Sequence, residues 1–76
     1  MRVYVLRLDG KPNLQRAFGM ISNAPDVVTC TVEAQLRQVR FLAPPGHADA
    51  LVQRIYLDGG LLWCSRHDVQ QTPASD

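Results

Sequence analysis

The side chains in this sequence that could carry out catalysis are not spaced so as to form a catalytic constellation. His47 and His67 are far apart, and Asp68 directly follows His67. Because adjacent residues on a strand point to opposite faces, Asp68 cannot orient His67 as a catalytic carboxylate would. Neither a His-x-x-x-His nor a Cys-x-x-Cys spacing occurs, so no metal site is expected. The sequence therefore predicts a protein that is not an enzyme and has no cofactor, with both histidines on the solvated surface.

The two cysteines, Cys30 and Cys64, lie in separate apolar stretches and do not form a close pair. Isolated cysteines of this kind favour neither a disulfide framework nor a redox motif. Since a free cysteine behaves as a small hydrophobic residue, both thiols are expected to be buried and unpaired.

Composition and charge restrict the class of protein. The 76 residues have room for one domain, and apolar residues make up 46% of them, which is typical of a globular fold. Eight basic and seven acidic residues give a net charge of +1, which offers no long-range field for nucleic acid. Arg7 interrupts the first apolar run too early for a signal peptide or a membrane span. We therefore expect a cytoplasmic protein with no membrane or nucleic-acid partner.

The first half of the sequence is typical of a strand, a helix and a second strand. Residues 2–8 are mostly β-branched, aromatic or aliphatic, and turn-forming residues follow at 9–12. A helix is expected after Pro12, ending near Ser22. Its apolar face consists of Leu14, Ala17, Phe18 and Ile21. Alternation of apolar and polar residues over 27–34 predicts a strand with one dry face. That face consists of Val28, Cys30 and Val32.

The second half repeats this order. A strand over 36–43 is joined to the preceding strand by a tight connection at Ala34-Gln35, which predicts a hairpin. A helix over 47–58 ends at Gly59-Gly60, because glycine adopts the left-handed backbone of a helix end. Its apolar stripe consists of Ala48, Leu51, Val52 and Ile55. The last strand, 61–67, has Leu62 and Cys64 on one face and Trp63, Ser65 and His67 on the other.

Two strand-helix-strand units in tandem predict an α+β protein with the ferredoxin-like βαββαβ sandwich fold. Right-handed crossovers give a four-stranded antiparallel sheet in the order 4-1-3-2, with two helices on one face. The domain is expected to span residues 1–69, and the polar segment 70–76 is expected to be a disordered tail.

From Ala17 to Leu62 the sequence resembles the heavy-metal-associated (HMA) domains of copper chaperones and mercury-binding proteins. The resemblance lies in the hairpin, the second helix and the glycine stop, at 27–33, 39–41, 50–55 and 59–60. That family binds a soft metal ion through a Cys-x-x-Cys pair in the loop after the first strand. The loop at 8–13 contains no thiol and carries Lys11, so the resemblance implies the fold without the metal site.

The amino-acid-sensing ACT domain is a second family with this topology, and it binds its ligand near the first loop and first helix of a dimer. Asp9-Gly10 lies at the corresponding place, although an Asp-Gly pair after a strand is also the usual sequence of a turn. The two resemblances together imply an alternative function, a small-ligand carrier or sensor.

Because both helices are expected on one face of the sheet, the other face remains open. We expect it to carry Val3, Val5, Arg7, Thr29, Thr31, Gln38, Arg40, Trp63, Ser65 and His67. Tyr4, Leu6 and Leu8 compete with Val3 and Val5 for the buried face of the first strand. A second alternative places Trp63 in the core and Leu62 at the surface.

The predicted binding residues are those that form an aromatic patch surrounded by cations. They are Trp63, Arg40, Arg7 and His67. Trp and Arg are enriched in interface hot spots, which favours a small non-enzymatic binding or regulatory module. It is expected to bind a protein partner, or to form a homodimer, through the open face or an edge strand. RNA binding is not expected, because the two central strands offer no aromatic side chain on this face.

Overall fold

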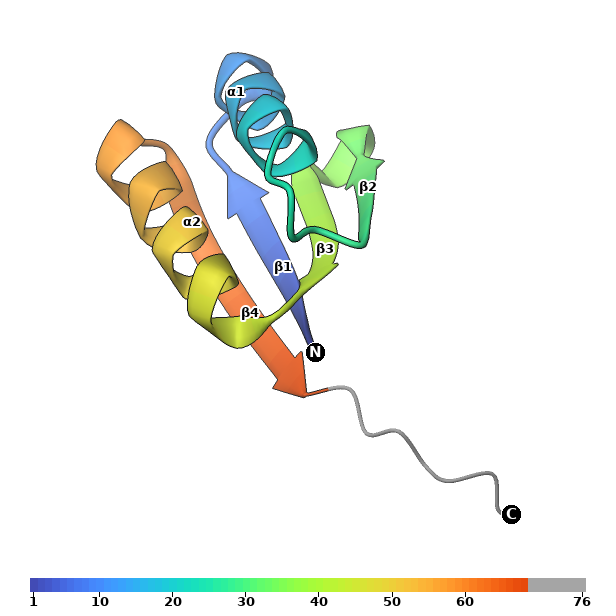
Figure 1. Ribbon diagram of the computed structural model, residues 1–76. Helices are drawn as coiled ribbons and strands as arrows, with labels where there is room; N and C mark the ends of the chain where they lie inside the picture. The colour runs from blue at the N-terminus through green and yellow to red at the C-terminus, as the bar shows by residue number, and fades with distance from the viewer. Residues whose placement is uncertain (69–76) are drawn as a thin grey trace.

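The computed structural model describes residues 1–68, and the tail expected at 70–76 lies outside the described residues. Figure 1 shows its helices and strands. In chain order they are β1 (Arg2–Leu8), α1 (Lys11–Ser22), β2 (Thr29–Glu33), the short 3-10 helix η1 (Ala34–Leu36), β3 (Gln38–Ala43), α2 (Pro45–Asp58) and β4 (Leu61–Asp68). Within residues 1–68, no helix has the length and apolar character needed to cross a membrane.

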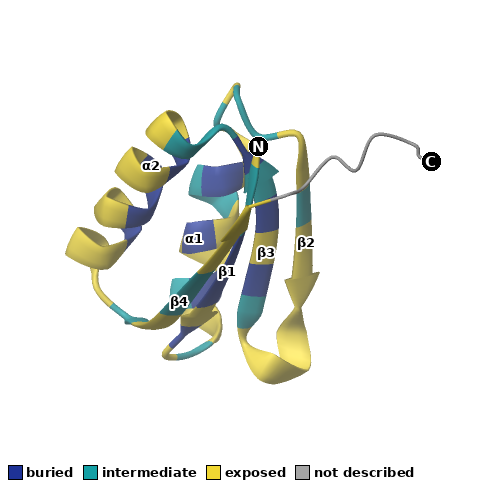
Figure 2. Ribbon diagram, turned by 90° about the horizontal axis from the view of Figure 1, so that it is seen from below, coloured by how far each residue is buried: buried dark blue, intermediate teal, exposed yellow. Residues whose placement is uncertain are grey.

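The four strands form one sheet in the order β2-β3-β1-β4, and each neighbouring pair is antiparallel. This confirms the predicted order 4-1-3-2, read from the other edge. Both helices lie over the same face of the sheet, as Figure 2 shows. The architecture is therefore α+β with the ferredoxin-like topology.

The core lies between the helices and the inner face of the sheet. Its strand residues are Tyr4, Leu6, Leu8, Val39, Phe41 and Ala43, and its helix residues are Leu14, Ala17, Ile21, Ala48, Leu51, Val52 and Ile55. Tyr4 and Phe41 are cross-strand partners whose rings stack with their centroids 5.0 Å apart. The buried face of β1 is therefore the one that carries Tyr4, which leaves Val3 and Val5 on the open face.

The Tyr4 hydroxyl lies at the boundary of this core and donates a hydrogen bond to Asp49 Oδ1 at 2.9 Å. Burial raises the pKa of Tyr4, and the hydrogen bond to the Asp49 carboxylate raises it further. The folded protein therefore holds the phenolic proton more tightly than the unfolded chain does. The resulting stabilisation is complete below the ordinary tyrosine pKa of about 10 and is lost as the pH rises through the folded-state value.

We expect Tyr4→Phe to lower the free energy of unfolding by about 1 kcal/mol near neutral pH, because one hydrogen bond is lost. The difference between wild type and variant should shrink above a pH of about 10, where the hydroxyl ionises. Urea denaturation of both proteins at several pH values measures this difference. A difference that stays constant to high pH would contradict the assignment of the hydrogen bond.

The prediction for β2 was wrong in two respects. The strand begins at Thr29, not at residue 27, so Val28 lies before it and is 57% exposed. Its inner face is not dry, because Val32 is 37% exposed. Phe18, expected on the buried face of α1, is 39% exposed. The physical reason is the position of β2 at the edge of the sheet, where no other strand of residues 1–68 covers the side facing away from β3.

The connection between β2 and β3 is longer than the predicted tight turn at Ala34-Gln35. The chain forms η1 there, and Arg37 follows it in a left-handed conformation with φ of 51°. The Arg37 N–H donates to the Ala34 carbonyl at 3.1 Å and closes the turn. As a result β3 begins at Gln38, two residues later than predicted.

Two boundaries in the second half also differ from the prediction. The helix α2 begins at Pro45 instead of His47, since proline suits the first turn of a helix. In β4 the alternation is interrupted near its start, because Arg7 pairs with Trp63 whereas Leu8 pairs with Leu61. This irregularity leaves Leu62 exposed and packs Leu61 against the core, whereas the sequence predicted Leu62 on the buried face.

Candidate binding surface

The face of the sheet opposite the helices, called the open face here, consists of three cross-strand rows. Running from β4 to β2, they are Trp63, Arg7, Gln38 and Glu33; Ser65, Val5, Arg40 and Thr31; and His67, Val3, Leu42 and Thr29. All ten residues expected on this face lie there. Leu42 and Glu33 complete it, and strict alternation from Arg40 and Thr31 would have identified both.

Trp63 and Arg7 are direct cross-strand neighbours in the first row. The Trp63 side chain is 51% exposed, so the alternative that it belongs to the core is wrong. Arg7 Nε donates to the Leu36 carbonyl at 3.3 Å, which directs the guanidinium toward the start of β3. Trp63 and Arg7 are therefore neighbours in this row, while the hydrogen bond directs the Arg7 guanidinium to the β3 side of β1, away from β4.

Arg40 lies in the middle row, between Val5 and Thr31. Val5, on the central strand β1 between Ser65 and Arg40, is only 7% exposed although it lies on the face opposite the helices. At the centre of the open face, the apolar Val5 therefore has the exposed Arg40 as its neighbour on β3. Arg40 and Arg7 occupy adjacent rows on neighbouring strands, so the structure brings them close to one another.

His67 is the predicted binding residue that the structure separates from the others. It lies in the third row beside Val3, four residues along β4 from Trp63, which corresponds to about 13 Å along a strand. Asp68 points to the other side of the sheet, where its Oδ1 accepts a hydrogen bond from Arg2 Nε at 2.7 Å. The Arg2 guanidinium holds the pKa of Asp68 below its usual range, and Asp68 does not orient His67.

The charges of the open face are mostly positive. Within residues 1–68, neither Arg7 nor Arg40 takes part in an ion pair. The carboxylates of Asp26, Asp49, Asp58 and Asp68 are paired with His47, Arg66, Arg16 and Arg2. The one acidic residue on the open face is Glu33, at its β2 edge. The guanidinium groups of Arg7 and Arg40 are therefore available to an outside carboxylate.

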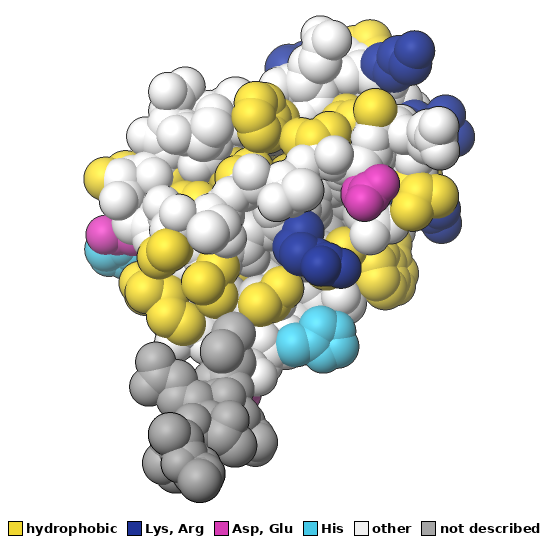
Figure 3. Space-filling view, turned by 90° about the vertical axis from the view of Figure 1, so that its right-hand side faces the viewer, with side chains coloured by type: hydrophobic (Ala, Val, Ile, Leu, Met, Phe, Trp, Pro, Cys, Tyr) yellow, Lys and Arg dark blue, Asp and Glu magenta, His cyan; other side chains and the backbone are white. Residues whose placement is uncertain are grey.

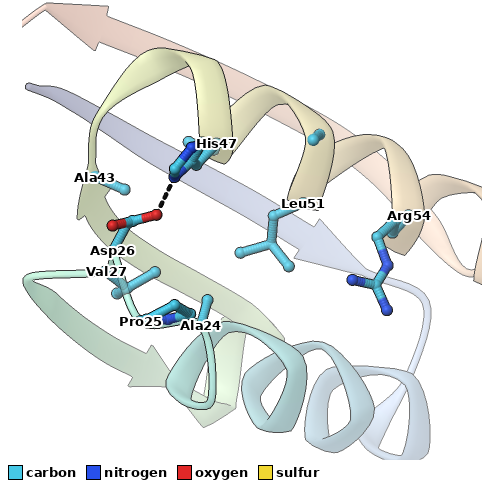
Figure 4. Close-up of a pocket in the computed structure, with 10 residues that line it drawn as sticks. Ala24, Pro25, Asp26, Val27, Ala43, His47, Leu51 and Arg54 are labelled. Carbon is cyan, nitrogen blue, oxygen red and sulfur yellow. Dashed lines mark hydrogen bonds and ion pairs between the residues drawn. The ribbon is translucent and has the colours of Figure 1, made fainter.

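A separate pocket lies between α2 and the loop that joins α1 to β2 (Figure 4). His47 at the start of α2 contacts the Asp26 carboxylate through Nδ1, and Leu51 points into the space beneath them. This His–Asp pair joins residues of two separate elements, so no local spacing could have revealed it. None of the ten residues that line this pocket within the described part of the chain is Ser, Thr or Cys.

Both cysteines lie on the inner face of the sheet, in its two outermost strands. Cys30 on β2 is the partner of Phe41, and Cys64 on β4 is the partner of Leu6. Both are unpaired thiols, partly buried against the core. Burial raises the pKa of each thiol, so the reactive thiolate is scarce near neutral pH.

We expect Cys30 and Cys64 to react slowly with iodoacetamide in the native protein and rapidly in denaturant, and to form no disulfide with each other. Their strands are three sheet spacings apart, about 14 Å, whereas a disulfide needs Cα atoms within about 7 Å. Mass spectrometry of native and unfolded samples measures both properties. A Cys30–Cys64 disulfide in oxidised monomer would contradict the strand order.

The segment 8–13, where the resemblance to the heavy-metal-associated domains predicts a loop, contains only the two-residue turn Asp9-Gly10 between β1 and α1. Gly10 adopts a φ of 146°, and the Asp9 N–H donates to the Gly60 carbonyl at 2.7 Å. Within the described part of the chain, no group of three or more His, Cys, Asp or Glu side chains could hold a metal ion. Comparison of the sequence with models of protein families and with curated proteins finds no match.

Proposed function

We propose that this two-layer ferredoxin-like sandwich is a non-enzymatic binding module, and that its open face binds a protein segment with carboxylates beside an apolar side chain. The observation that carries this proposal is the juxtaposition in the first two rows. Exposed Trp63 lies next to Arg7, Arg40 lies in the adjacent row, and neither arginine takes part in an ion pair within residues 1–68.

The chemistry of these side chains supports a protein partner. Tryptophan and arginine are the residues most enriched in interface hot spots, where a large apolar group is buried and a guanidinium is paired. A carboxylate can accept two parallel hydrogen bonds from one guanidinium. Glu33 at the β2 edge repels the same carboxylate, so the binding position lies toward β1 and β4.

A nucleic-acid strand fits this face less well. Single-stranded nucleic acids bind to sheets through several aromatic side chains on which successive bases stack. Within the described residues the open face has one aromatic side chain, Trp63, and it lies on an edge strand. The net charge of +1 adds no long-range attraction for phosphates.

An NMR titration tests the proposal with a synthetic peptide in which Glu alternates with Leu and Phe. We expect backbone shifts concentrated on the open-face positions of β1, β3 and β4, together with a change in Trp63 fluorescence. The matched control is the same peptide with Lys in place of Glu, which should bind far more weakly. Shifts confined to the helices, or equal binding of both peptides, would contradict the proposal.

The alternative function, a carrier or sensor of a metal ion or an amino acid, makes a different prediction in the same experiment. Adding Cu(I), Zn(II) or free amino acids should then move the signals of the Asp9-Gly10 turn and of the start of α1. The open-face signals should remain in place. A tight stoichiometric complex of this kind would replace the proposed function.

A further inference from the structure

The outer edge of β2 is a second surface of the molecule that has the features of an interface. Within residues 1–68, β2 pairs only with β3, so its other edge presents backbone N–H and C=O groups without strand partners. A groove of about 640 Å³ runs beside this edge, between β2 and α1. Its lining consists of Lys11, Leu14, Gln15, Phe18, Cys30, Thr31, Val32 and Ala34. Figure 3 views the molecule from this side and shows hydrophobic side chains at the surface.

The sequence of β2 has the pattern of a strand with one buried face, yet the single chain does not bury that face. Val32 lies opposite the fully buried Val39 and therefore faces the helix layer, but its own side chain is substantially exposed. Phe18 on α1 is also exposed and lines the same groove. Two side chains that the sequence predicts to be buried, Phe18 and Val32, are therefore exposed at one edge of the molecule.

The opposite edge of the sheet, at β4, is protected against strand addition in the ways that natural proteins use. Arg66 is the partner of buried Tyr4, so it is a charged residue facing the helix layer, and it pairs with Asp49 at 3.7 Å. The pairing of β4 also contains a register irregularity at Arg7 and Leu8. In β2 the register is regular, and its five residues include no proline, no basic residue and no charge except Glu33.

We infer that β2 pairs with the β2 strand of a second copy of this chain, antiparallel about Thr31, and joins the two sheets into one. In this register Thr31 lies opposite the other Thr31. Cys30 lies opposite Val32 of the other copy, so both groups on the inner face are apolar. The two Phe18 side chains then lie along the new strand pair and cover it from the helix side.

The side-chain pattern of the strand favours a second copy as the occupant of this edge, because apolar residues face each other on the inner face and polar residues face each other on the open face. With Thr31 on the two-fold axis, each Glu33 faces Thr29 of the other copy, so the two carboxylates lie at opposite ends of the pair. Their separation is about four residues along a strand, or roughly 13 Å, at which repulsion between exposed charges is screened at physiological salt. Pairing about Thr31 therefore matches the strand with itself in polarity and keeps its like charges apart, as a two-fold interface between identical strands requires.

Sedimentation velocity over a range of protein concentrations tests this inference. We expect a monomer–dimer equilibrium for the wild type, and a dissociation constant raised about tenfold or more by Val32→Glu, since an inward-facing charge at an edge opposes pairing. The matched control is Leu57→Glu, the same chemical change at an exposed position of α2, which should leave the equilibrium unchanged. A wild type that stays monomeric at millimolar concentration overturns the inference.

A cross-linking experiment keeps the inference testable if Val32→Glu unfolds the chain. In a Cys30→Ser, Cys64→Ser background, Thr31→Cys places two thiols opposite each other on the two-fold axis. Facing residues of antiparallel strands have Cα atoms about 4.5 to 5.5 Å apart, which a disulfide spans. We expect rapid oxidation to a covalent dimer with Thr31→Cys and none with Leu57→Cys in the same background. Equal rates for the two variants would overturn the inference.

The proposed β2 interface is separate from the open face. Experiments can therefore contradict the dimer without contradicting the proposed peptide binding, and the reverse. Trp63→Ala should leave the monomer–dimer equilibrium unchanged, and Val32→Glu should leave binding of the acidic peptide unchanged. A dimer that Trp63→Ala dissociates and Val32→Glu does not would place the second copy on the open face and overturn pairing through β2.

Discussion

Ile55→Ala is expected to lower the free energy of unfolding by about 2 to 5 kcal/mol, the range for removing a buried aliphatic side chain. Ile55 lies on α2, is 2% exposed, and belongs to the core between helix and sheet. The loss includes the transfer energy of the removed methyl and methylene groups and the cost of the cavity left behind. For a domain of this size it is a large share of the total stability.

Chemical denaturation of the wild type and variant measures this loss. Leu57→Ala is the matched control, because Leu57 lies on the same helix but is exposed, and it should change stability by no more than about 0.5 kcal/mol. Leu51→Ala should fall near the lower end of the Ile55 range, since Leu51 borders the pocket beside Asp26. Losses below about 1 kcal/mol for both Ile55 and Leu51 would mean that α2 does not pack on the sheet as described.

Trp63→Ala is expected to weaken binding of the Glu-containing peptide by about thirtyfold, which corresponds to the 2 kcal/mol typical of a hot-spot residue. The indole is half-exposed on an edge strand, so removing it takes no group from the core. The variant should therefore fold with nearly unchanged stability. Isothermal titration calorimetry gives the affinity, and denaturation gives the stability.

Tyr56→Ala is the matched control for Trp63→Ala. Tyr56 is another exposed aromatic residue, but it lies on α2, in the helix layer on the other side of the sheet. Its removal should leave peptide affinity unchanged. Equal losses of affinity in the two variants would show that binding depends on exposed aromatic residues in general and not on the open face.

The order of helices and strands and most of the core could be predicted from the sequence, because both depend on local periodicity. Ala48, Leu51, Val52 and Ile55 recur with the helical repeat, and all four are buried. The glycine stop after α2 is also confirmed, with Gly59 and Gly60 at φ of 98° and 86°. These features need only the residues within one turn or one strand.

Features that depend on how distant segments pack together could not be predicted from local periodicity. Periodicity places Val32 on the inner face of its strand. Only the strand order shows that this strand lies at the edge of the sheet, with no other strand of residues 1–68 beyond it. The register irregularity at Arg7 and Leu8 packs Leu61 against the core and leaves Leu62 exposed. Nothing in the local sequence of β4 marks this irregularity. The His47–Asp26 contact joins two elements that only the fold brings together.

For the open face, the sequence predicted which residues share it but not how they are grouped. Alternation along each strand placed Trp63, Arg7, Arg40 and His67 on one side of the sheet. The cross-strand register then placed Trp63 beside Arg7 and moved His67 two rows away. Register depends on how the strands slide relative to one another, and it is decided by the packing of the whole inner face.

The strand order also determines when folding can finish. The first strand of the chain, β1, lies between β3 and β4, so its pairing is complete only when Arg2 meets Asp68 from the far end of the described chain. Pairs so distant in sequence form late and slow the folding of a small domain. A nascent chain that has not yet released β4 from the ribosome therefore carries one edge of β1 without its strand partner, and it is most exposed to aggregation at that stage.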